Sequence, residues 1–150
     1  MRRAAAFLSL AALGLLAACS GTTPYRDGGE KNLEVRTELS GSRLRASLEV
    51  YRIDAQCKME YEGTVALDAP LVATGIPTGR PTILVFTFAS SPLFGARGTV
   101  SRQTLVQPRP GYRYRIDARY KDDIYDIALS EISREGTARR LELSTQGACK

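Results

Sequence analysis

From Leu33 onward, apolar and polar residues alternate with period two, which is the spacing of half-buried β-strands and not of helices. A run that is apolar on both faces, residues 82–88, predicts a central strand, and weaker alternation predicts strands over 99–106 and 139–144. The clearest alternation predicts strands over residues 33–39, 44–50, 57–68, 112–121 and 124–132. Glycine, proline and serine separate these runs, so the chain is expected to form seven to eight short strands joined by turns.

The phase of the alternation predicts which side chains face the core. In residues 57–68, Cys57, Met59 and Tyr61 share one phase and are expected to point inward. Seven to eight strands in about 115 residues predict an all-β fold, namely an antiparallel β-sandwich.

Two segments resemble a known kind of β-sandwich. "LVATGIPTGRPTILVF" is similar to the small-turn-then-strand pattern of transthyretin-like and carboxypeptidase-regulatory-like modules, and "PRPGYRYRIDARY" resembles the entry to their later strands. The resemblance implies a transthyretin-like or immunoglobulin-like sandwich, and it implies nothing about catalysis.

The first residues have the form of a secretory signal. A basic start, Met1-Arg2-Arg3, precedes an apolar run that is too short for a membrane-spanning helix. Leu16-Ala17-Ala18-Cys19 resembles the bacterial lipobox, which implies cleavage after residue 18 and acylation of the Cys19 sulfur. The alternative is an ordinary cleaved signal that happens to precede a cysteine. Ser20 is compatible with sorting to the outer membrane, with the protein facing the periplasm.

These patterns divide the chain into three parts. Residues 1–18 are expected to be the cleaved signal peptide and residues 33–150 the β-sandwich domain. Between them, residues 19–32 are polar and rich in glycine and threonine, and they are expected to form the lipidated N-terminus and a flexible tether.

The chain has three cysteines. If Cys19 carries lipid, Cys57 and Cys149 are left as a pair in an oxidising compartment, where a disulfide is expected. Two free thiols are the alternative.

Charge and composition restrict the classes of function. The formal charge of +5 becomes +3 when Arg2 and Arg3 leave with the signal, and basic residues alternate with acids, so no nucleic-acid partner is expected. The chain contains no histidine, which removes imidazole-based catalysis and the common zinc sites. We therefore expect no enzyme activity, no cofactor and no metal site. Four aspartates lie close together in the sequence, namely Asp117, Asp122, Asp123 and Asp126. The preference of aspartate for turns explains them better than a calcium site or a pair of catalytic acids does.

Two surface features are candidates for partner binding. The outward phase of one strand contains Arg113, Arg115 and Arg119, either as a solvated face paired with acids such as Glu60 and Glu62 or as a contact for acidic lipopolysaccharide, anionic lipid or an acidic partner. In the loop 89–98, Leu93 and Phe94 either fold back over the sandwich edge or form a partner-binding tip.

The sequence therefore favours a non-enzymatic interaction or structural module. It is expected to be held to the membrane by acyl chains on Cys19 and to bind an envelope protein, as an accessory of an envelope or secretion complex. The alternative is a lipoprotein that binds a glycan or another small envelope molecule.

Overall fold

The structure is a computed structural model that describes residues 22–27, 29–39, 44–90, 98–121 and 124–144. The elements in these ranges are nine β-strands and no helix: β1 (Leu33–Leu39), β2 (Leu44–Ile53), β3 (Met59–Ala66), β4 (Leu71–Thr74), β5 (Thr82–Ser90), β6 (Gly98–Val106), β7 (Arg113–Lys121), β8 (Ile124–Ile132) and β9 (Ala138–Leu141). With no helix in these ranges, the described chain offers no helical membrane span.

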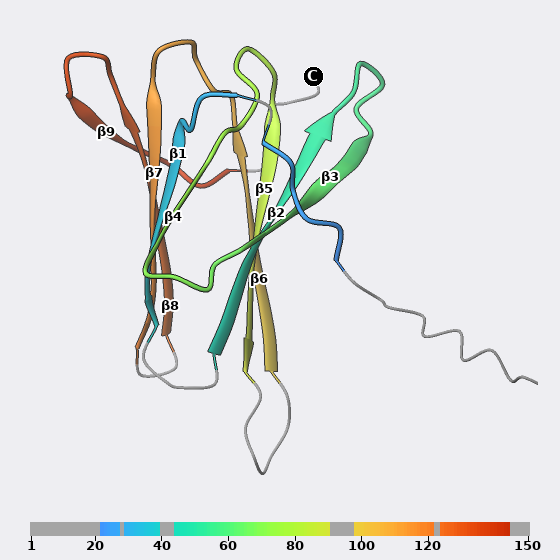
Figure 1. Cartoon of the computed structure of the whole chain (residues 1–150), viewed down its shortest axis with the longest axis vertical. Helices are drawn as coiled ribbons and strands as arrows, with labels where there is room; N and C mark the ends of the chain where they lie inside the picture. The colour runs from blue at the N-terminus through green and yellow to red at the C-terminus, as the bar shows by residue number, and fades with distance from the viewer. Residues whose placement is uncertain (1–21, 28, 40–43, 91–97, 122–123, 145–150) are drawn as a thin grey trace, which may run out of the picture.

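The strands form two sheets that pack face to face as a β-sandwich (Figure 1). One sheet has five strands in the order β4-β1-β7-β8-β9, and the other has four in the order β3-β2-β5-β6. This confirms the predicted all-β sandwich. The short strand β4 lies between two predicted strands, where proline and glycine predict turns, because its four residues are too few to show an alternation.

The prediction of a purely antiparallel sandwich is wrong at one pair of strands. β1 pairs in parallel with β7 over its whole length, from Leu33 opposite Tyr114 to Leu39 opposite Tyr120. Parallel neighbours need a long crossover connection. Here the connection between β1 and β7 contains all four strands of the other sheet, which are β2, β3, β5 and β6.

The core lies between the sheets and follows the predicted alternation in most strands. In β7, Tyr114, Ile116 and Ala118 are each about 1% exposed or less. Central strand β5 lies between β2 and β6, as predicted. The other buried apolar side chains include Leu33, Val35, Ala46, Leu48, Val50, Leu84, Phe86, Phe88, Val106, Ile127 and Leu129.

A β-bulge reverses the predicted phase in the first half of β3. Val50 lies opposite Gly63, but the next residue, Tyr51, lies opposite Tyr61, so Glu62 is extra. One extra residue moves the following side chains to the other face of a sheet. Met59 and Tyr61, predicted to be inward, are therefore on the outer face, 47% and 43% exposed.

Cys57 is also not on the core side, contrary to the prediction. It lies in the exposed turn between β2 and β3, with a left-handed backbone φ of 64°. The Asp54 carboxylate shapes this turn by accepting the backbone N–H groups of Gln56 and Lys58, each at 2.8 Å. The strand begins only at Met59, after the turn.

The described part of residues 22–32 packs on the sandwich and is not a flexible tether. Pro24 forms an isolated parallel bridge with Thr64 of β3, the outer edge strand. The Thr64 N–H donates to the Thr23 carbonyl at 2.8 Å, and the Tyr25 N–H donates to the Thr64 carbonyl at 2.9 Å. The Tyr25 hydroxyl donates to the Gly75 carbonyl at 2.9 Å, so the segment joins β3 to the loop after β4. It covers an edge strand that would otherwise expose unpaired backbone groups.

A second crossing closes the opposite side of the sandwich. The Leu105 N–H of β6 donates to the carbonyl of Ser144 at 2.7 Å, so the chain that leaves β9 passes to the edge of the other sheet. Segments from both ends of the described chain thus connect the two sheets, one at the β3 and β4 side and one at the β6 and β9 side.

Candidate functional site

Four of the residues predicted to carry function lie outside the described residues: Cys19, Leu93, Phe94 and Cys149. Acylation of Cys19, the pairing of Cys57 with Cys149 and the two alternatives for the 89–98 loop therefore stay predictions.

The predicted arginines of β7 point outward, as the alternation requires. Arg119 Nε lies 3.2 Å from the Glu38 carboxylate, and Arg115 Nε lies 3.5 Å from Asp117. The predicted pairing of this stripe with Glu60 and Glu62 is wrong. Those two acids belong to the four-stranded sheet, where both form ion pairs with Arg52.

The register of the five-stranded sheet places Arg140 of β9 on the same outer face as Arg113 and Arg115. Arg115 lies opposite Ser130 of β8, which lies opposite Arg140 of β9, so the three side chains share the outer face. Arg113 is two residues before Arg115 on the same face. With strands about 4.8 Å apart, the Cα atoms of Arg115 and Arg140 are about 10 Å apart. We call Arg113, Arg115 and Arg140 the arginine group.

Arg115 of the arginine group is partly neutralised, because Glu34 of β1 lies opposite it in register and Asp117 is 3.5 Å from its Nε. Neither Arg113 nor Arg140 forms an ion pair with a described residue. Arg115 Nε is buried and has no hydrogen-bond partner in the described ranges, since its contact with Asp117 is too poorly aligned to be a hydrogen bond. Three guanidinium groups around the Ser130 side chain can accept an anionic group from a partner.

A buried carboxylate lies on the other face of β8 and β9. The Glu131 side chain is 6% exposed and accepts hydrogen bonds from Arg109 Nε at 2.9 Å and from Arg139 Nη2 at 3.0 Å. Arg109 Nη2 makes a second ion-paired hydrogen bond to it. The buried Tyr114 hydroxyl also donates to Glu131, at 2.9 Å. We call these four residues the Glu131 cluster.

The Glu131 cluster stabilises the ionised form of the Glu131 carboxyl group. Hydrogen bonding from Arg109 is the main reason that the pKa of Glu131 is lowered from its ordinary value of 4.5, in spite of burial. The cluster ties the β6–β7 connection to β8 and β9. Sequence reasoning missed it, although Glu131 occupies the inward phase of the alternation that includes Ile127 and Leu129, where an acid needs partners.

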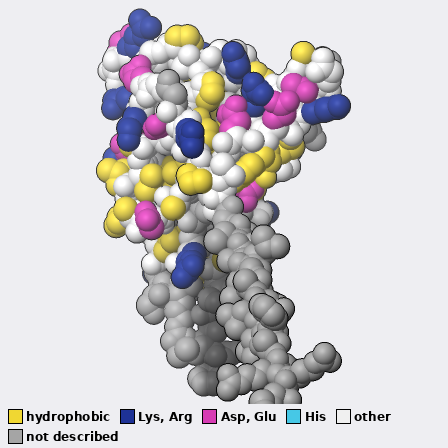
Figure 2. Space-filling model, turned by 45° about the vertical axis from the view of Figure 1, so that its right-hand side comes forward, with side chains coloured by type: hydrophobic (Ala, Val, Ile, Leu, Met, Phe, Trp, Pro, Cys, Tyr) yellow, Lys and Arg dark blue, Asp and Glu magenta, His cyan; other side chains and the backbone are white. Residues whose placement is uncertain are grey.

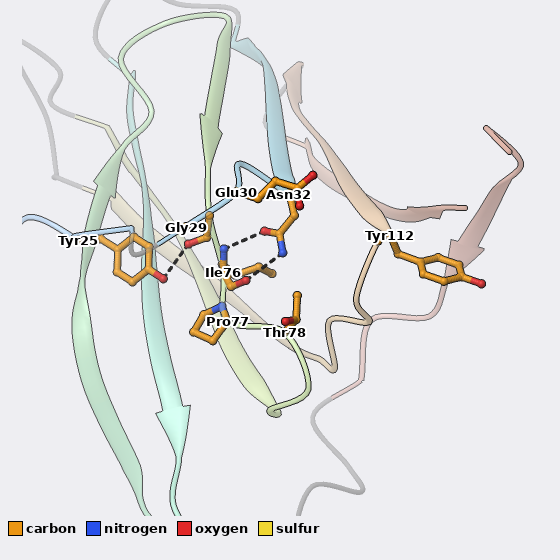
Figure 3. Close-up of a pocket in the computed structure, with 10 residues that line it drawn as sticks. Tyr25, Gly29, Glu30, Asn32, Ile76, Pro77, Thr78 and Tyr112 are labelled. Carbon is orange, nitrogen blue, oxygen red and sulfur yellow. Dashed lines mark hydrogen bonds between the residues drawn. The ribbon is translucent and has the colours of Figure 1, made fainter. Parts of the chain in front are cut away.

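A cavity of about 330 Å³ lies at one end of the sandwich, between residues 25–32, the loop after β4 and the loop before β7 (Figure 3). The Asn32 amide occupies its centre. Its nitrogen donates to the Ile76 carbonyl at 2.9 Å, and its oxygen accepts the Ile76 N–H at 2.8 Å. Both backbone groups of Ile76 are therefore bonded to the Asn32 side chain, as they would be to the backbone of a neighbouring strand. These bonds hold the segment before β1 against the loop after β4.

Two of the polar side chains that line the cavity, Tyr25 and Asn32, are bonded to the loop after β4. Figure 3 shows the Asn32 amide directed at Ile76 and the Tyr112 ring pointing away from both, and the Tyr25 hydroxyl donates to the Gly75 carbonyl. Arg109 stacks on the Tyr112 ring, with its guanidinium carbon 3.8 Å from the ring centre. Ligand sites need polar groups that are open to the ligand. Tyr25 and Asn32 are used in structural hydrogen bonds, while the Glu30 carboxylate and the Thr78 hydroxyl also line the cavity.

Metal ligands do not gather in the described ranges, where no three or more histidine, cysteine or acidic residues lie together. Asp117 contacts Arg115, and Asp122 and Asp123 are outside the described residues.

The geometry defines the chain as a β-sandwich with a docked N-terminal segment and an arginine-bearing outer face. Solved structures of transthyretin from the sea bream Sparus aurata resemble it at 16% sequence identity. One matches with a TM-score of 0.48 over 69% of this chain and all of the transthyretin chain. A thyroxine complex matches with a TM-score of 0.43 over 77% of this chain and 98% of the transthyretin chain. No protein-family model and no curated protein matches the sequence.

Proposed function

We propose that this chain is a lipid-anchored protein of the outer membrane, facing the periplasm, and that it works as a non-enzymatic interaction module. In this proposal the arginine group binds an acidic region of an envelope protein. The observation that carries the proposal is that Arg113, Arg115 and Arg140 lie together on one face and that Arg113 and Arg140 form no ion pair with a described residue.

The position of the anchor supports a protein partner over a lipid one. Thr23, four residues after Cys19, is bonded to β3 at the edge of the four-stranded sheet. The arginine group lies on β7 and β9, on the outer face of the other sheet. The acyl chains would therefore hold the opposite sheet towards the membrane and leave the arginine group facing the periplasm.

The proposal includes a disulfide between Cys57 and Cys149. Ser144 is bonded to β6, and β3 lies three strand spacings, or about 14 Å, across the sheet from β6. Five further residues span up to about 17 Å when extended, which exceeds the distance across the sheet from β6 to β3.

A photo-crosslinking residue at Ala138 tests the partner. Ala138 is exposed and lies in the same row as Arg113, so the probe enters the arginine group without removing any arginine. In intact envelopes the acylated protein is expected to give a discrete protein adduct. Reversing the charge of Arg113 and Arg140 to glutamate should lower its yield roughly tenfold or more, because arginines at an interface often contribute over 1 kcal/mol each.

Two controls make that result specific. The same probe at Gln103, exposed on β6 of the other sheet, should give no such adduct, and Arg45→Glu on β2 should leave the Ala138 adduct unchanged. Equal adducts from Ala138 and Gln103 would contradict the proposal. An adduct with lipopolysaccharide or a glycan in place of a protein would favour the ligand-binding alternative.

A further inference from the structure

The β2–β3 hairpin presents apolar side chains to the outside. Tyr51 of β2 and Tyr61 of β3 are register partners whose ring centres are 5.4 Å apart. Met59 is two residues before Tyr61 and shares its face, and it is 47% exposed. We call Tyr51, Met59 and Tyr61 the hairpin patch.

The polar groups of the hairpin patch are bonded within the protein. The Tyr51 hydroxyl donates to the Glu49 carboxylate at 2.6 Å, and this hydrogen bond is the main reason that the pKa of Tyr51 is raised to about 12. The Tyr61 hydroxyl lies 2.6 Å from the Thr64 hydroxyl. The apolar parts of these side chains therefore remain as the open contact surface.

Arg52 and Glu60 are register partners one position from the pairs of the hairpin patch, so their side chains lie on the opposite face of the hairpin. Arg52 forms ion pairs with Glu60 and, at 3.7 Å, with Glu62. Figure 2 turns the right-hand side of Figure 1 forward and shows dark-blue and magenta side chains intermixed over its upper part, with yellow side chains below them. The hairpin patch itself presents aromatic rings beside the Glu49 carboxylate, and such rings are suited to the boundary between headgroups and acyl chains.

The hairpin patch also lies close to where the chain must enter the membrane. The Tyr61 hydroxyl is 3.3 Å from the carbonyl oxygen of Thr23. Three residues separate Thr23 from Cys19, and the four steps between their Cα atoms span at most about 14 Å in a fully extended chain. The docked N-terminal segment therefore limits how far Tyr61 can be from an acylated Cys19.

We propose that the hairpin patch lies in the interfacial region of the bilayer that holds the Cys19 acyl chains. This inference rests on the proposed lipid anchor and adds an orientation to it: the four-stranded sheet faces the lipid. Because the anchor is in the same chain, insertion of the patch is intramolecular, and a few side chains suffice to orient the domain.

Tryptophan fluorescence tests the orientation cleanly, because the chain contains no tryptophan. Met59→Trp places one reporter in the hairpin patch. The acylated full-length protein is reconstituted in vesicles of phosphatidylethanolamine and phosphatidylglycerol with brominated acyl chains. The emission is expected to shift to the blue and to lose most of its intensity relative to vesicles without bromine.

Ile124→Trp is the matched control, since Ile124 is an apolar residue of β8 in the other sheet and is 69% exposed. Its emission should be the same in both kinds of vesicle. Ile53→Trp, which shares the outer face of the hairpin, gives a second reporter if Met59→Trp impairs folding.

Vesicle flotation separates failure of the inference from failure of the anchor. If the full-length protein does not float with vesicles, the lipid anchor is wrong. If it floats and neither reporter in the hairpin is quenched, the anchor stands and the proposed orientation is overturned. Equal quenching of the hairpin and Ile124 reporters would also overturn it.

Discussion

Replacing Glu131 by alanine is expected to lower the free energy of unfolding by about 2–4 kcal/mol. The substitution removes the acceptor of the buried Tyr114 hydroxyl and the charge-assisted hydrogen bonds from Arg109 and Arg139. In a domain of this size the loss corresponds to a fall in melting temperature of about 10 °C, measured by circular dichroism or calorimetry.

Glu38→Ala is the matched control. Glu38 also pairs with an arginine, but its side chain is 74% exposed, so its removal should change the unfolding free energy by less than about 1 kcal/mol. Equal effects of the two substitutions would show that the Glu131 cluster does not hold the β6–β7 connection to β8 and β9.

The lowered pKa of Glu131 also predicts how the unfolding free energy of a further variant, Glu131→Gln, depends on pH. An acid with a lowered pKa in the folded state adds stability above its unfolded pKa, near 4.5, and loses it as pH falls through the folded value. The stability difference between wild type and Glu131→Gln should therefore be constant at neutral pH and narrow below about pH 4.5.

Replacing Gly63 by alanine is expected to release the N-terminal segment from β3. Gly63 has a φ of +144°, and a Cβ atom there would lie 2.5 Å from the Tyr25 Cα. A side-chain clash with another backbone cannot be relieved by a rotamer change. We expect a loss of about 2–4 kcal/mol, from backbone strain and from the hydrogen bonds between Thr64 and the segment.

Trypsin provides the direct measurement of that release. Cleavage after the exposed Arg26 should be slow when the segment is docked and at least about tenfold faster in Gly63→Ala, because proteases cut locally opened chain. Gly79→Ala is the control, since Gly79 has a φ of +76° but no atom within 4 Å of the added Cβ. If trypsin cuts both variants at the same rate, the clash with Tyr25 does not cause the release of the N-terminal segment.

The sequence predicted the strands well wherever alternation continues without interruption. In β1, β2, β7 and β8 the apolar phase matches the buried face, because a sheet with one covered face has to bury every second side chain. Where the alternation is interrupted the prediction fails. The turn at Cys57 and the bulge at Glu62 move Met59 and Tyr61 outward, and a single extra residue leaves no signal in the hydrophobic pattern.

Contacts between remote segments could not be predicted from the sequence. The parallel pairing of β1 with β7 and the grouping of Arg140 with Arg115 depend on which strands become neighbours. The docking of residues 22–32 depends on backbone hydrogen bonds and on side-chain bonds from Tyr25 and Asn32 to the loop after β4, and polar composition reveals neither set of partners. Glu131 is the exception, because an acid in the buried phase of β8 already indicates partners for its charge.

The lipid anchor is the central claim, since both the partner-facing side and the proposed orientation depend on it. Its most direct test is the intact mass of the protein purified from envelopes of the producing bacterium, together with the mass of its N-terminal peptide. The account predicts a chain that begins at residue 19 and carries diacylglyceryl and acyl groups on Cys19, and a Cys19→Ser variant that lacks them. An unmodified Cys19 in a protein that still fractionates with the outer membrane would contradict it.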